Sequence, residues 1–366
     1  GRVLDELLGD PAYRRDVATL GDKQMCMIGY SDSAKDGGFF ASNWSLYRAQ
    51  QRLSDVADRH GVRLTQFHGR GGALGRGGGP AARAILSLPP ASVNGRLRLT
   101  EQGEVIAERY DDPAIAVRHL EQLFWATLTL DAEDRCDAAT DRDRLAGAVA
   151  EHSLDAYRRL IDDPSFARYM QQCTALPLIE TLRIGSRPAR RSGVQRLEDL
   201  RAIPFTFAWN QVRLPINAFY GLGAAFDSLD DHDRRRMGRL YDCWPWMQAV
   251  IDNAELALAR CDPAIARRYA ALADDQALAE AVWQRLSVEC TRARQAVLAI
   301  KGEGELLAHV AWLQRALRIR TPYVDILNLV QVELLARQQQ AGDTGEFNHA
   351  LRRTVQAIAA GLRNTG

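Results

Sequence analysis

A strand–helix–strand pattern between residues 24 and 67 constrains the fold of this chain more than any other feature. Residues 24–30 (QMCMIGY) form a short apolar run, and residues 39–59 carry apolar side chains at roughly helical spacing. His60-Gly61 ends this helical stretch, and a second apolar run covers residues 62–67. A strand, a helix and a strand of these lengths form a βαβ crossover, so the two strands are predicted to be parallel.

The rest of the chain is predicted to be mostly helical. Two strand-like segments, residues 177–184 and 203–209, interrupt the helical pattern, and each lies beside a loop that bears arginine. The sequence therefore predicts a predominantly helical α/β fold, a section of an α/β barrel with a large helical elaboration. The expected helices cover residues 80–87, 102–110, 113–130, 141–161, 164–173, 230–260, 263–300, 303–318, 322–340 and 346–363.

Composition narrows the class of protein. A hydrophobic fraction of 46% and a net charge of +1 fit a folded chain and give no support for a nucleic-acid or membrane partner. No apolar run approaches the roughly 20 residues that cross a bilayer. Six scattered cysteines without a CxxC pair are predicted to be reduced thiols of a cytoplasmic protein. The start at Gly1, without a signal peptide, indicates a fragment or a processed chain.

The strongest local signal is the glycine-rich stretch HGRGGALGRGGG at residues 68–79. Seven of the eleven residues from Gly69 to Gly79 are glycine, and Arg70 and Arg76 carry the only charges there. Glycine lets backbone N–H groups approach a ligand, and guanidinium groups bind phosphate and carboxylate oxygens. The pattern lacks the Gly-Lys-Ser/Thr of a Walker A loop. It predicts a closing loop that binds an anion, in preference to a flexible linker.

A second polar segment, residues 29–38 (GYSDSAKDGG), follows the first predicted strand. Asp32 is a hard oxygen ligand suited to Mg²⁺ or Mn²⁺, and Lys35 can stabilise developing negative charge. A helix N-cap explains the same residues about as well when the segment is taken alone. Two charged loops on consecutive parallel strands favour a functional site, because chemistry gathers at that edge of a barrel.

Arginines beside strand ends and prolines form a further group of candidates. They lie in residues 185–191 (GSRPARR), 200–205 (LRAIPF) and 209–213 (WNQVR). Binding a small phosphorylated anion requires several such cationic groups. No Ser/His/Asp or Cys/His arrangement stands out.

Taken together, these motifs resemble the successive signatures of phosphoenolpyruvate carboxylases. The resemblance covers nearly the whole chain, in the order of the family, and its two glycine-rich motifs are long and specific. The matching segments are residues 29–37, 67–78, 100–104, 185–188, 200–204, 327–328 and 363–366.

The resemblance implies the C-terminal part of a large, mainly helical enzyme built round a TIM-like barrel, usually a homotetramer. Such enzymes join bicarbonate to phosphoenolpyruvate and give oxaloacetate and phosphate, with Mg²⁺ or Mn²⁺. It implies barrel strands and active-site loops over about 20–215 and a helical region with inhibitor-site residues over about 216–366.

The resemblance also implies roles for individual residues. Asp32 matches a metal ligand. Lys35, His68, Arg70 and Arg76 match catalytic residues, and Arg187 and Arg201 match substrate-binding arginines. Arg76, Arg260, Arg320 and Asn364 match the residues that would bind aspartate or malate as an inhibitor. The family has lysine where Arg260 stands, which keeps the charge but changes the hydrogen-bond geometry.

Two groups of the family are missing from the sequence. The base histidine of a Thr-Ala-His-Pro-Thr motif is absent, and the second metal-ligand glutamate is expected just upstream of residue 1. Leu178-Ile-Glu-Thr181 imitates the glutamate motif but lies far downstream, so we reject it. We therefore expect this chain alone to be inactive. The alternative is a non-catalytic module of the same fold that binds anions or senses dicarboxylates.

Overall fold

The computed structural model describes residues 1–69, 81–100, 103–130, 139–182, 188–190, 197–341 and 347–362. The described chain forms two compact units. The first consists of residues 1–31, 42–146 and 239–250, and the second of residues 32–41, 147–238 and 251–366.

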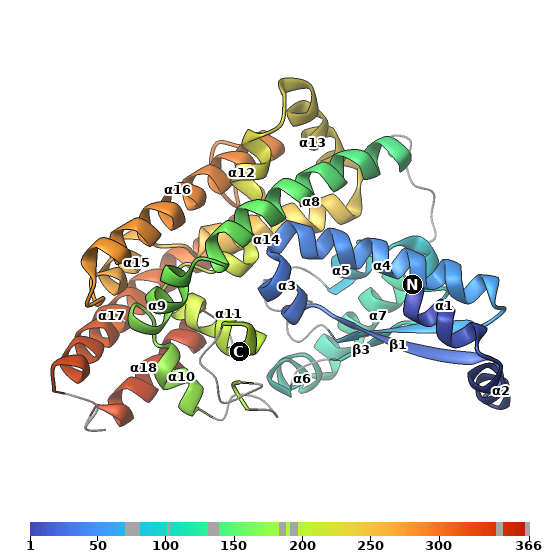
Figure 1. Ribbon diagram of the computed structural model, residues 1–366, viewed down its shortest axis with the longest axis horizontal. Helices are drawn as coiled ribbons and strands as arrows, with labels where there is room; N and C mark the ends of the chain where they lie inside the picture. Colours follow the sequence, from blue (N-terminus) through green and yellow to red (C-terminus); the bar gives the residue numbers. More distant parts are fainter. Residues whose placement is uncertain are drawn as a thin grey trace. The chain divides into compact units, whose positions relative to one another are not determined.

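Figure 1 shows the helices and strands along the chain. The first part contains α1 (Arg2–Gly9), α2 (Pro11–Thr19), β1 (Lys23–Gly29), α3 (Ser31–Gly37), α4 (Phe39–Arg59), β2 (Arg63–Gly69), α5 (Ala81–Leu86), β3 (Arg98–Leu99), α6 (Gly103–Tyr110), α7 (Pro113–Thr129) and α8 (Ala139–Ile161). The remainder contains α9 (Pro164–Gln172), α10 (Leu176–Thr181), α11 (Ala202–Gln211), α12 (Leu222–Asp227), α13 (Asp231–Cys243), α14 (Pro245–Ala259), α15 (Pro263–Ala270), α16 (Gln276–Lys301), α17 (Ala311–Ala341) and α18 (Asn348–Leu362).

The first unit contains a small parallel sheet in the order β1-β2-β3. β1 and β2 pair in register from Lys23↔Arg63 to Gly29↔Gly69. This pairing confirms the strand–helix–strand prediction, including the helix between the strands. α4 ends at Arg59, and Gly61 follows with a positive φ of 63°, a conformation that glycine adopts without strain.

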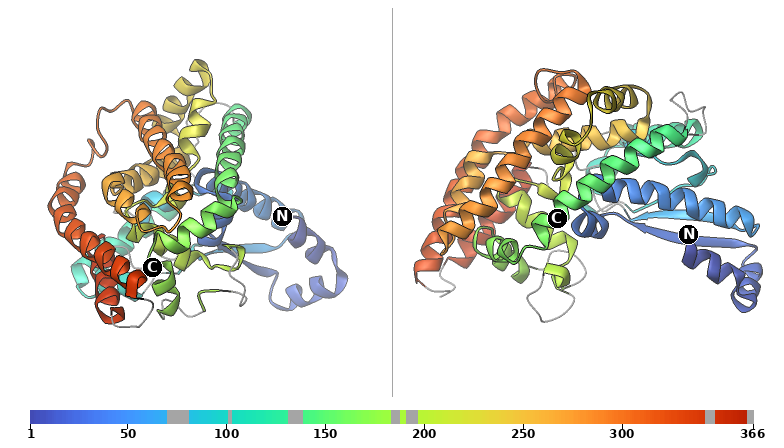
Figure 2. Two further views of the ribbon diagram at one scale, coloured as in Figure 1. Left: turned by 60° about the vertical axis from the view of Figure 1, so that its left-hand side comes forward. Right: turned by 45° about the horizontal axis from the view of Figure 1, so that its top comes forward.

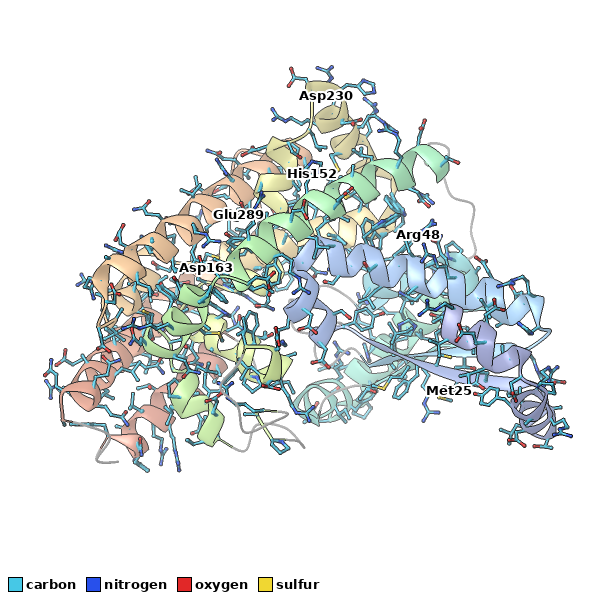
Figure 3. The ribbon with its side chains drawn as sticks, viewed as in Figure 1. Met25, Arg48, His152, Asp163, Asp230 and Glu289 are labelled. Carbon is cyan, nitrogen blue, oxygen red and sulfur yellow. The ribbon has the colours of Figure 1, made fainter. Side chains whose placement is uncertain are left out.

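The two faces of the sheet have different surroundings. One face meets α4, where the Gln66 amide donates to the Gln50 carbonyl (2.9 Å) and to the Ser54 hydroxyl (3.1 Å). On the other face, Met25 (labelled in Figure 3) and Met27 are 44% and 67% exposed. The alternation along β1 is typical of a strand with a single covered face.

The second unit is a helical assembly around buried aromatic side chains. Trp209 is fully buried and stacks on Phe166, with ring centroids 5.5 Å apart, and on Tyr169. Figures 1 and 2 show α18 alongside the C-terminal half of α17. Val324 of α17 and Ile358 of α18 belong to the same core cluster. α17 continues through residues 318–322, where the sequence predicted a break, and Pro322 lies inside it.

Both predicted strands in the arginine-bearing region are wrong. Residues 177–184 overlap α10, which has Pro177 in its first turn, a favourable place for proline. Residues 203–209 lie within α11, whose side chains are buried on nearly every side. A short helix that is apolar all round has no periodicity to distinguish it from a buried strand.

The observed fold confirms the coarser prediction, a predominantly helical α/β fold with parallel strands. The barrel and the division near residue 215 remain predictions. Among the described cysteines, Cys26, Cys173, Cys261 and Cys290 are free thiols, but Cys243 is disulfide-bonded. The prediction of reduced thiols throughout is therefore wrong, since spacing along a chain does not reveal which thiols a fold brings together.

No helix in the described ranges is both long enough and apolar enough to cross a membrane.

Candidate functional site

The carboxyl ends of β1 and β2 lie at one edge of the sheet, because the strands are parallel and Ile28 pairs with His68. Beyond this edge, the Tyr30 hydroxyl lies 2.8 Å from Nδ1 of His68. The backbone carbonyl of His68 accepts a hydrogen bond from the Thr100 N–H at 3.2 Å. The His68 residue is buried, with 1% of its surface exposed. Tyr30 thus contacts the imidazole and the Thr100 N–H holds the backbone of His68, and the ring can take part in proton transfer or hydrogen bonding at the strand end.

Lys35 is also buried (4% exposed) and belongs to the second unit, on α3. Its Nζ lies 2.7 Å from a carboxylate oxygen of Asp36 and donates to the Leu197 carbonyl at 3.4 Å. The Tyr157 hydroxyl donates to the Lys35 carbonyl at 2.7 Å. Burial, followed by the charge of Asp36, raises the pKa of Tyr157, so the phenol remains a donor. These contacts fix α3 through both its backbone and its lysine.

The end of α3 requires glycine. Gly38 has a φ of +74°, and a Cβ there would lie 2.8 Å from Cγ of Tyr157. Any side chain would displace the tyrosine that holds Lys35. The second glycine of the Gly37-Gly38 pair is therefore explained by close packing as well as by backbone conformation.

Asp32 lies in the first turn of α3 and is solvent-exposed. A carboxylate in this position offers hard oxygen ligands, and Mg²⁺ is commonly bound through one or two carboxylates and substrate phosphates. The residue type and exposure of Asp32 therefore fit the metal that the family resemblance implies.

Arg201 immediately precedes α11, and its backbone N–H donates to the Ala189 carbonyl at 2.9 Å. Nε of Arg201 is buried and has no hydrogen-bond partner among the described residues. A buried guanidinium N–H without a partner is costly, so an anion at this position would be stabilised. Lys35 donates a hydrogen bond to the carbonyl of Leu197, which stands four residues before Arg201. This contact brings α3 close to the segment that carries Arg201.

The segment before Arg201 is held by a local ion pair. Arg190 and Leu200 form an antiparallel bridge, and Nε of Arg190 lies 2.6 Å from Glu180. Glu180 belongs to the LIET segment that imitates a metal-ligand motif. Its pairing with arginine agrees with our rejection of that motif.

Arg260 and Arg320 are brought together from distant parts of the sequence. Burial, and then the positive charge of Arg320, lowers the pKa of Arg260 to about 10. Arg213 fixes the Arg260 backbone, since its Nε donates to the Arg260 carbonyl at 3.1 Å. Its Nη1 lies 2.6 Å from Asp325, on the helix that carries Arg320. A dianion beside the two like charges would relieve their repulsion.

A buried polar network joins α11 to α17. Nδ2 of Asn328 donates to the Gln211 carbonyl (2.7 Å) and to the Tyr269 hydroxyl (2.9 Å). Gln331 donates to the Gln211 side chain and accepts from the Tyr269 hydroxyl at 2.7 Å. The helix that begins after Arg201 and the helix that carries Arg320 thus share one polar core.

One cluster has the residue types of a metal site but does not fit a metal. Ligand atoms of Asp252, Glu255 and His309 lie within 4.8 Å of one another. Nζ of Lys301, 1% exposed, lies 2.9 Å from Asp252 and 2.6 Å from Glu255. The ammonium group pairs with both carboxylates and offsets part of their negative charge, so the cluster is an internal ion-pair network.

The structure places only part of the predicted set. His68 lies in the first unit, and Asp32, Lys35, Arg201, Arg260 and Arg320 lie in the second. Arg70, Arg76, Arg187 and Asn364 lie outside the described residues. Our sequence analysis named Arg213 among the candidate arginines for an anion, but the structure pairs it with Asp325 and with the Arg260 carbonyl. It assigned no site role to Tyr30 or Tyr157. Tyr30 could have been inferred from its place in the polar segment of residues 29–38, but Tyr157 has no local signal.

These elements define a mainly helical α/β protein with parallel strands, a buried histidine at a strand end and a buried Nε of Arg201. A family model described as phosphoenolpyruvate carboxylase matches residues 1–366. The chain belongs to the phosphoenolpyruvate carboxylase family.

Several curated relatives carry the same description. The chain is 41% identical over 375 residues to "Phosphoenolpyruvate carboxylase" of Nitrosomonas europaea, and 42% identical over 372 and 374 residues to those of Azoarcus sp. and Mycobacterium leprae. Each alignment covers the whole chain but only 40% or 41% of the relative. The chain therefore spans about two fifths of the length of these proteins.

Proposed function

We propose that this chain is the C-terminal part of an enzyme that carboxylates phosphoenolpyruvate with bicarbonate, giving oxaloacetate and phosphate. The observation that carries the proposal is the family match over all 366 residues. The relatives' printed name supports the same reaction. The buried histidine at a strand end and the buried Nε of Arg201 supply groups that such anionic substrates need.

The proposed reaction proceeds in three steps. A bicarbonate oxygen attacks phosphorus and the pyruvate enolate leaves, which gives carboxyphosphate. Carboxyphosphate then breaks into CO₂ and phosphate, and the enolate carbon attacks CO₂. Positively charged groups that are already oriented stabilise each anionic species without a cost of reorganisation.

The proposed roles follow the resemblance to the family. Lys35 stabilises developing negative charge, His68 and Arg70 line the site for phosphate and bicarbonate, and Arg76 stabilises carboxyphosphate. Arg187 and Arg201 bind substrate carboxylate or phosphate oxygens. Asp32 is the proposed Mg²⁺ or Mn²⁺ ligand, and a bound divalent ion would supply charge stabilisation at phosphate and enolate oxygens.

Feedback inhibition by aspartate or malate is part of the proposal. The proposed inhibitor site consists of Arg76, Arg260, Arg320 and Asn364. The lowered pKa of Arg260 supports it, because its causes are burial and, after burial, the positive charge of Arg320. A complete protein that assembles as a cytoplasmic homotetramer is also proposed from the family.

The chain alone is proposed to be inactive, because no histidine in it precedes a proline as in the base motif. A non-catalytic module that binds dicarboxylates is the second candidate, and the Arg260–Arg320 pair is the observation that favours it. An upstream Thr-Ala-His-Pro motif in the same reading frame would exclude this candidate.

A coupled assay for oxaloacetate, with phosphoenolpyruvate, bicarbonate and Mg²⁺, tests the proposal on this chain and on the full-length gene product. We expect activity only in the full-length protein. Lys35→Met should remove it, whereas Lys23→Met, an exposed lysine of β1, should retain it. Inactivity of both proteins would favour the non-catalytic module, and turnover by this chain would refute our assignment of the missing base.

A further inference from the structure

Tyr30 links the carboxyl ends of β1 and β2. It directly follows Gly29, the last residue of β1, and its hydroxyl lies 2.8 Å from Nδ1 of His68 on β2. The two rings are tilted by 32° with their centroids 6.2 Å apart, so the hydroxyl is the part of Tyr30 that reaches the imidazole. In a neutral histidine, the hydrogen bond made by one ring nitrogen decides which nitrogen carries the proton. Tyr30 is therefore placed to set the tautomer of His68.

The sheet fixes His68 itself. Its backbone pairs with Ile28 of β1, and its carbonyl accepts from the Thr100 N–H at 3.2 Å. His68 stands two residues after Gln66, so both side chains point to the same face of β2, where the Gln66 amide donates to the Gln50 carbonyl of α4. Both residues are 1% exposed. Because the backbone is fixed and the ring is buried, the hydrogen bonds of the ring determine how His68 meets a ligand.

We propose that Tyr30 is a positioning residue, which donates a hydrogen bond to Nδ1 of His68 and so keeps the proton of the neutral imidazole on Nε2. A phenol hydroxyl can donate, and the unprotonated nitrogen of a neutral imidazole accepts. With Nδ1 accepting from Tyr30, the ring offers Nε2–H to an oxyanion oxygen of bicarbonate or phosphate. The identity of this ligand rests on the proposed function.

The opposite tautomer would bind an anion poorly. A ring with its proton on Nδ1 presents a lone pair at Nε2, which repels a bicarbonate or phosphate oxygen. Nε2 of His68 is buried, so bulk water does not screen this repulsion. A proton that is held on Nε2 before the substrate arrives spares the ring a reorganisation in each reaction cycle.

Tyr13 provides a matched comparison at the other end of β1. Its hydroxyl lies 2.9 Å from Oε1 of Gln24, to which it donates, and both residues belong to the first unit. Neither residue has a role in the proposed reaction. Tyr13→Phe therefore removes a comparable hydrogen bond of a tyrosine hydroxyl without altering the contacts of His68.

The first test is steady-state kinetics of the full-length protein with Tyr30→Phe, which keeps the ring and removes only the hydroxyl. KM for bicarbonate or for phosphoenolpyruvate should rise about fivefold while kcat changes less than about twofold, because the positioned N–H contributes to binding. The substrate whose KM rises is the one that His68 contacts. Tyr13→Phe should leave the kinetics unchanged. Unchanged kinetics in Tyr30→Phe, or a fall in kcat with both KM values unchanged, would overturn the proposal.

The second test repeats the substitution in a His68→Gln background. The glutamine amide offers an N–H near the position of Nε2 and has no tautomer to set. Tyr30→Phe should then change KM by less than about twofold, since residues that act through one another are not additive. The full fivefold rise in this background would show that the hydroxyl acts through a group other than His68, and the proposal would be wrong.

The third test locates the proton by solid-state nitrogen NMR of full-length protein labelled in histidine, with His68→Gln to assign the signal. We expect the proton on Nε2 in the neutral ring, and a mixture of both tautomers in Tyr30→Phe. A proton on Nδ1, or an unchanged signal in Tyr30→Phe, would refute the role of Tyr30. A protein with the expected tautomer that forms no oxaloacetate would refute the proposed function and leave the positioning of the ring intact.

Discussion

Two groups of buried charge in the second unit are built in opposite ways. Around Lys301, an ammonium group is matched by the carboxylates of Asp252 and Glu255 at 2.9 and 2.6 Å. Around Arg260, burial and then another positive charge, that of Arg320, lower the pKa. Burial is costly for an ion unless an opposite charge compensates it.

From this difference we expect the first group to support the fold and the second to bind a ligand. The Lys301 cluster satisfies itself, and Glu255 also accepts from the Leu307 N–H at 2.8 Å. The pKa of Arg260 is lowered by burial and then by the positive charge of Arg320, and unusual pKa values of this kind gather at functional sites. Variants in the first group should therefore alter stability, and variants in the second should alter binding.

The largest loss in the free energy of unfolding is expected for Glu255→Ala. The change removes the fully buried partner of Lys301, leaves only Asp252 beside the ammonium group and deprives the Leu307 N–H of its acceptor, so it should cost about 3 kcal/mol. Urea denaturation of the full-length protein measures the change in the free energy of unfolding. Glu333→Ala is the control, because Glu333 pairs with Arg337 at the exposed surface, where an ion pair is worth about 0.5 kcal/mol. Equal losses in the two variants would contradict a structural role for the cluster.

Glu289 represents a third arrangement, a buried carboxylate compensated by backbone dipoles. It lies where α16 passes α12 (Figure 3), and its Oε1 accepts from the N–H groups of Gly221 and Gly223, both at 2.9 Å. Burial raises its pKa from 4.5 to about 7, although these N–H groups and the charge of Arg292 oppose the shift.

The pH dependence of stability should reveal this carboxyl group. Between pH 4.5 and about 7 the folded state retains a proton that the unfolded state releases, so stability should fall as pH rises through this window. The expected loss is about 3 kcal/mol. In Glu289→Gln this contribution should disappear, as measured by urea denaturation at several pH values. The same slope in the variant would show that another group titrates.

The sequence predicted the parts of the fold that have a local period. The parallel strands and α4 follow from two short apolar runs on either side of a stretch with helical apolar spacing, all within 45 residues. α10 and α11 were taken for strands, because burial on nearly every side removes the period that would identify a helix.

In the candidate site, too, local motifs revealed some residues and left others undetected. Asp32, Lys35 and His68 could be proposed because glycine-rich and polar motifs surround them. The contacts that hold them could not, since Tyr157 reaches Lys35 across 122 positions of sequence and Arg213 reaches Asp325 across 112. Contacts over such separations depend on packing of the whole unit, which no local pattern encodes.

Arg213→Met should have an intermediate effect. The variant lacks the hydrogen bond to the Arg260 carbonyl and the ion pair with Asp325. Because Asp325 is partly exposed, water can solvate its carboxylate in the variant. The expected loss in the free energy of unfolding is therefore about 2 kcal/mol. Arg213 also has a positive φ of 59°, and Arg213→Lys retains both that backbone and a positive charge. The lysine variant should therefore recover part of the stability. Loss of aspartate affinity beyond the loss of stability would show that Arg213 also positions Arg260.

The smallest effect on stability, and a clear effect on binding, is expected for Arg320→Met. Removing one of two like charges relieves repulsion, so the pKa of Arg260 should rise and stability should not fall. Loss of one charged hydrogen bond to a dicarboxylate should cost about 1.5 kcal/mol, roughly tenfold in affinity for aspartate. Calorimetry measures this affinity, with Arg318→Met, an exposed arginine on the same helix, as the control. A destabilised Arg320→Met protein with unchanged affinity would place Arg320 with Lys301, among charges that only support the fold.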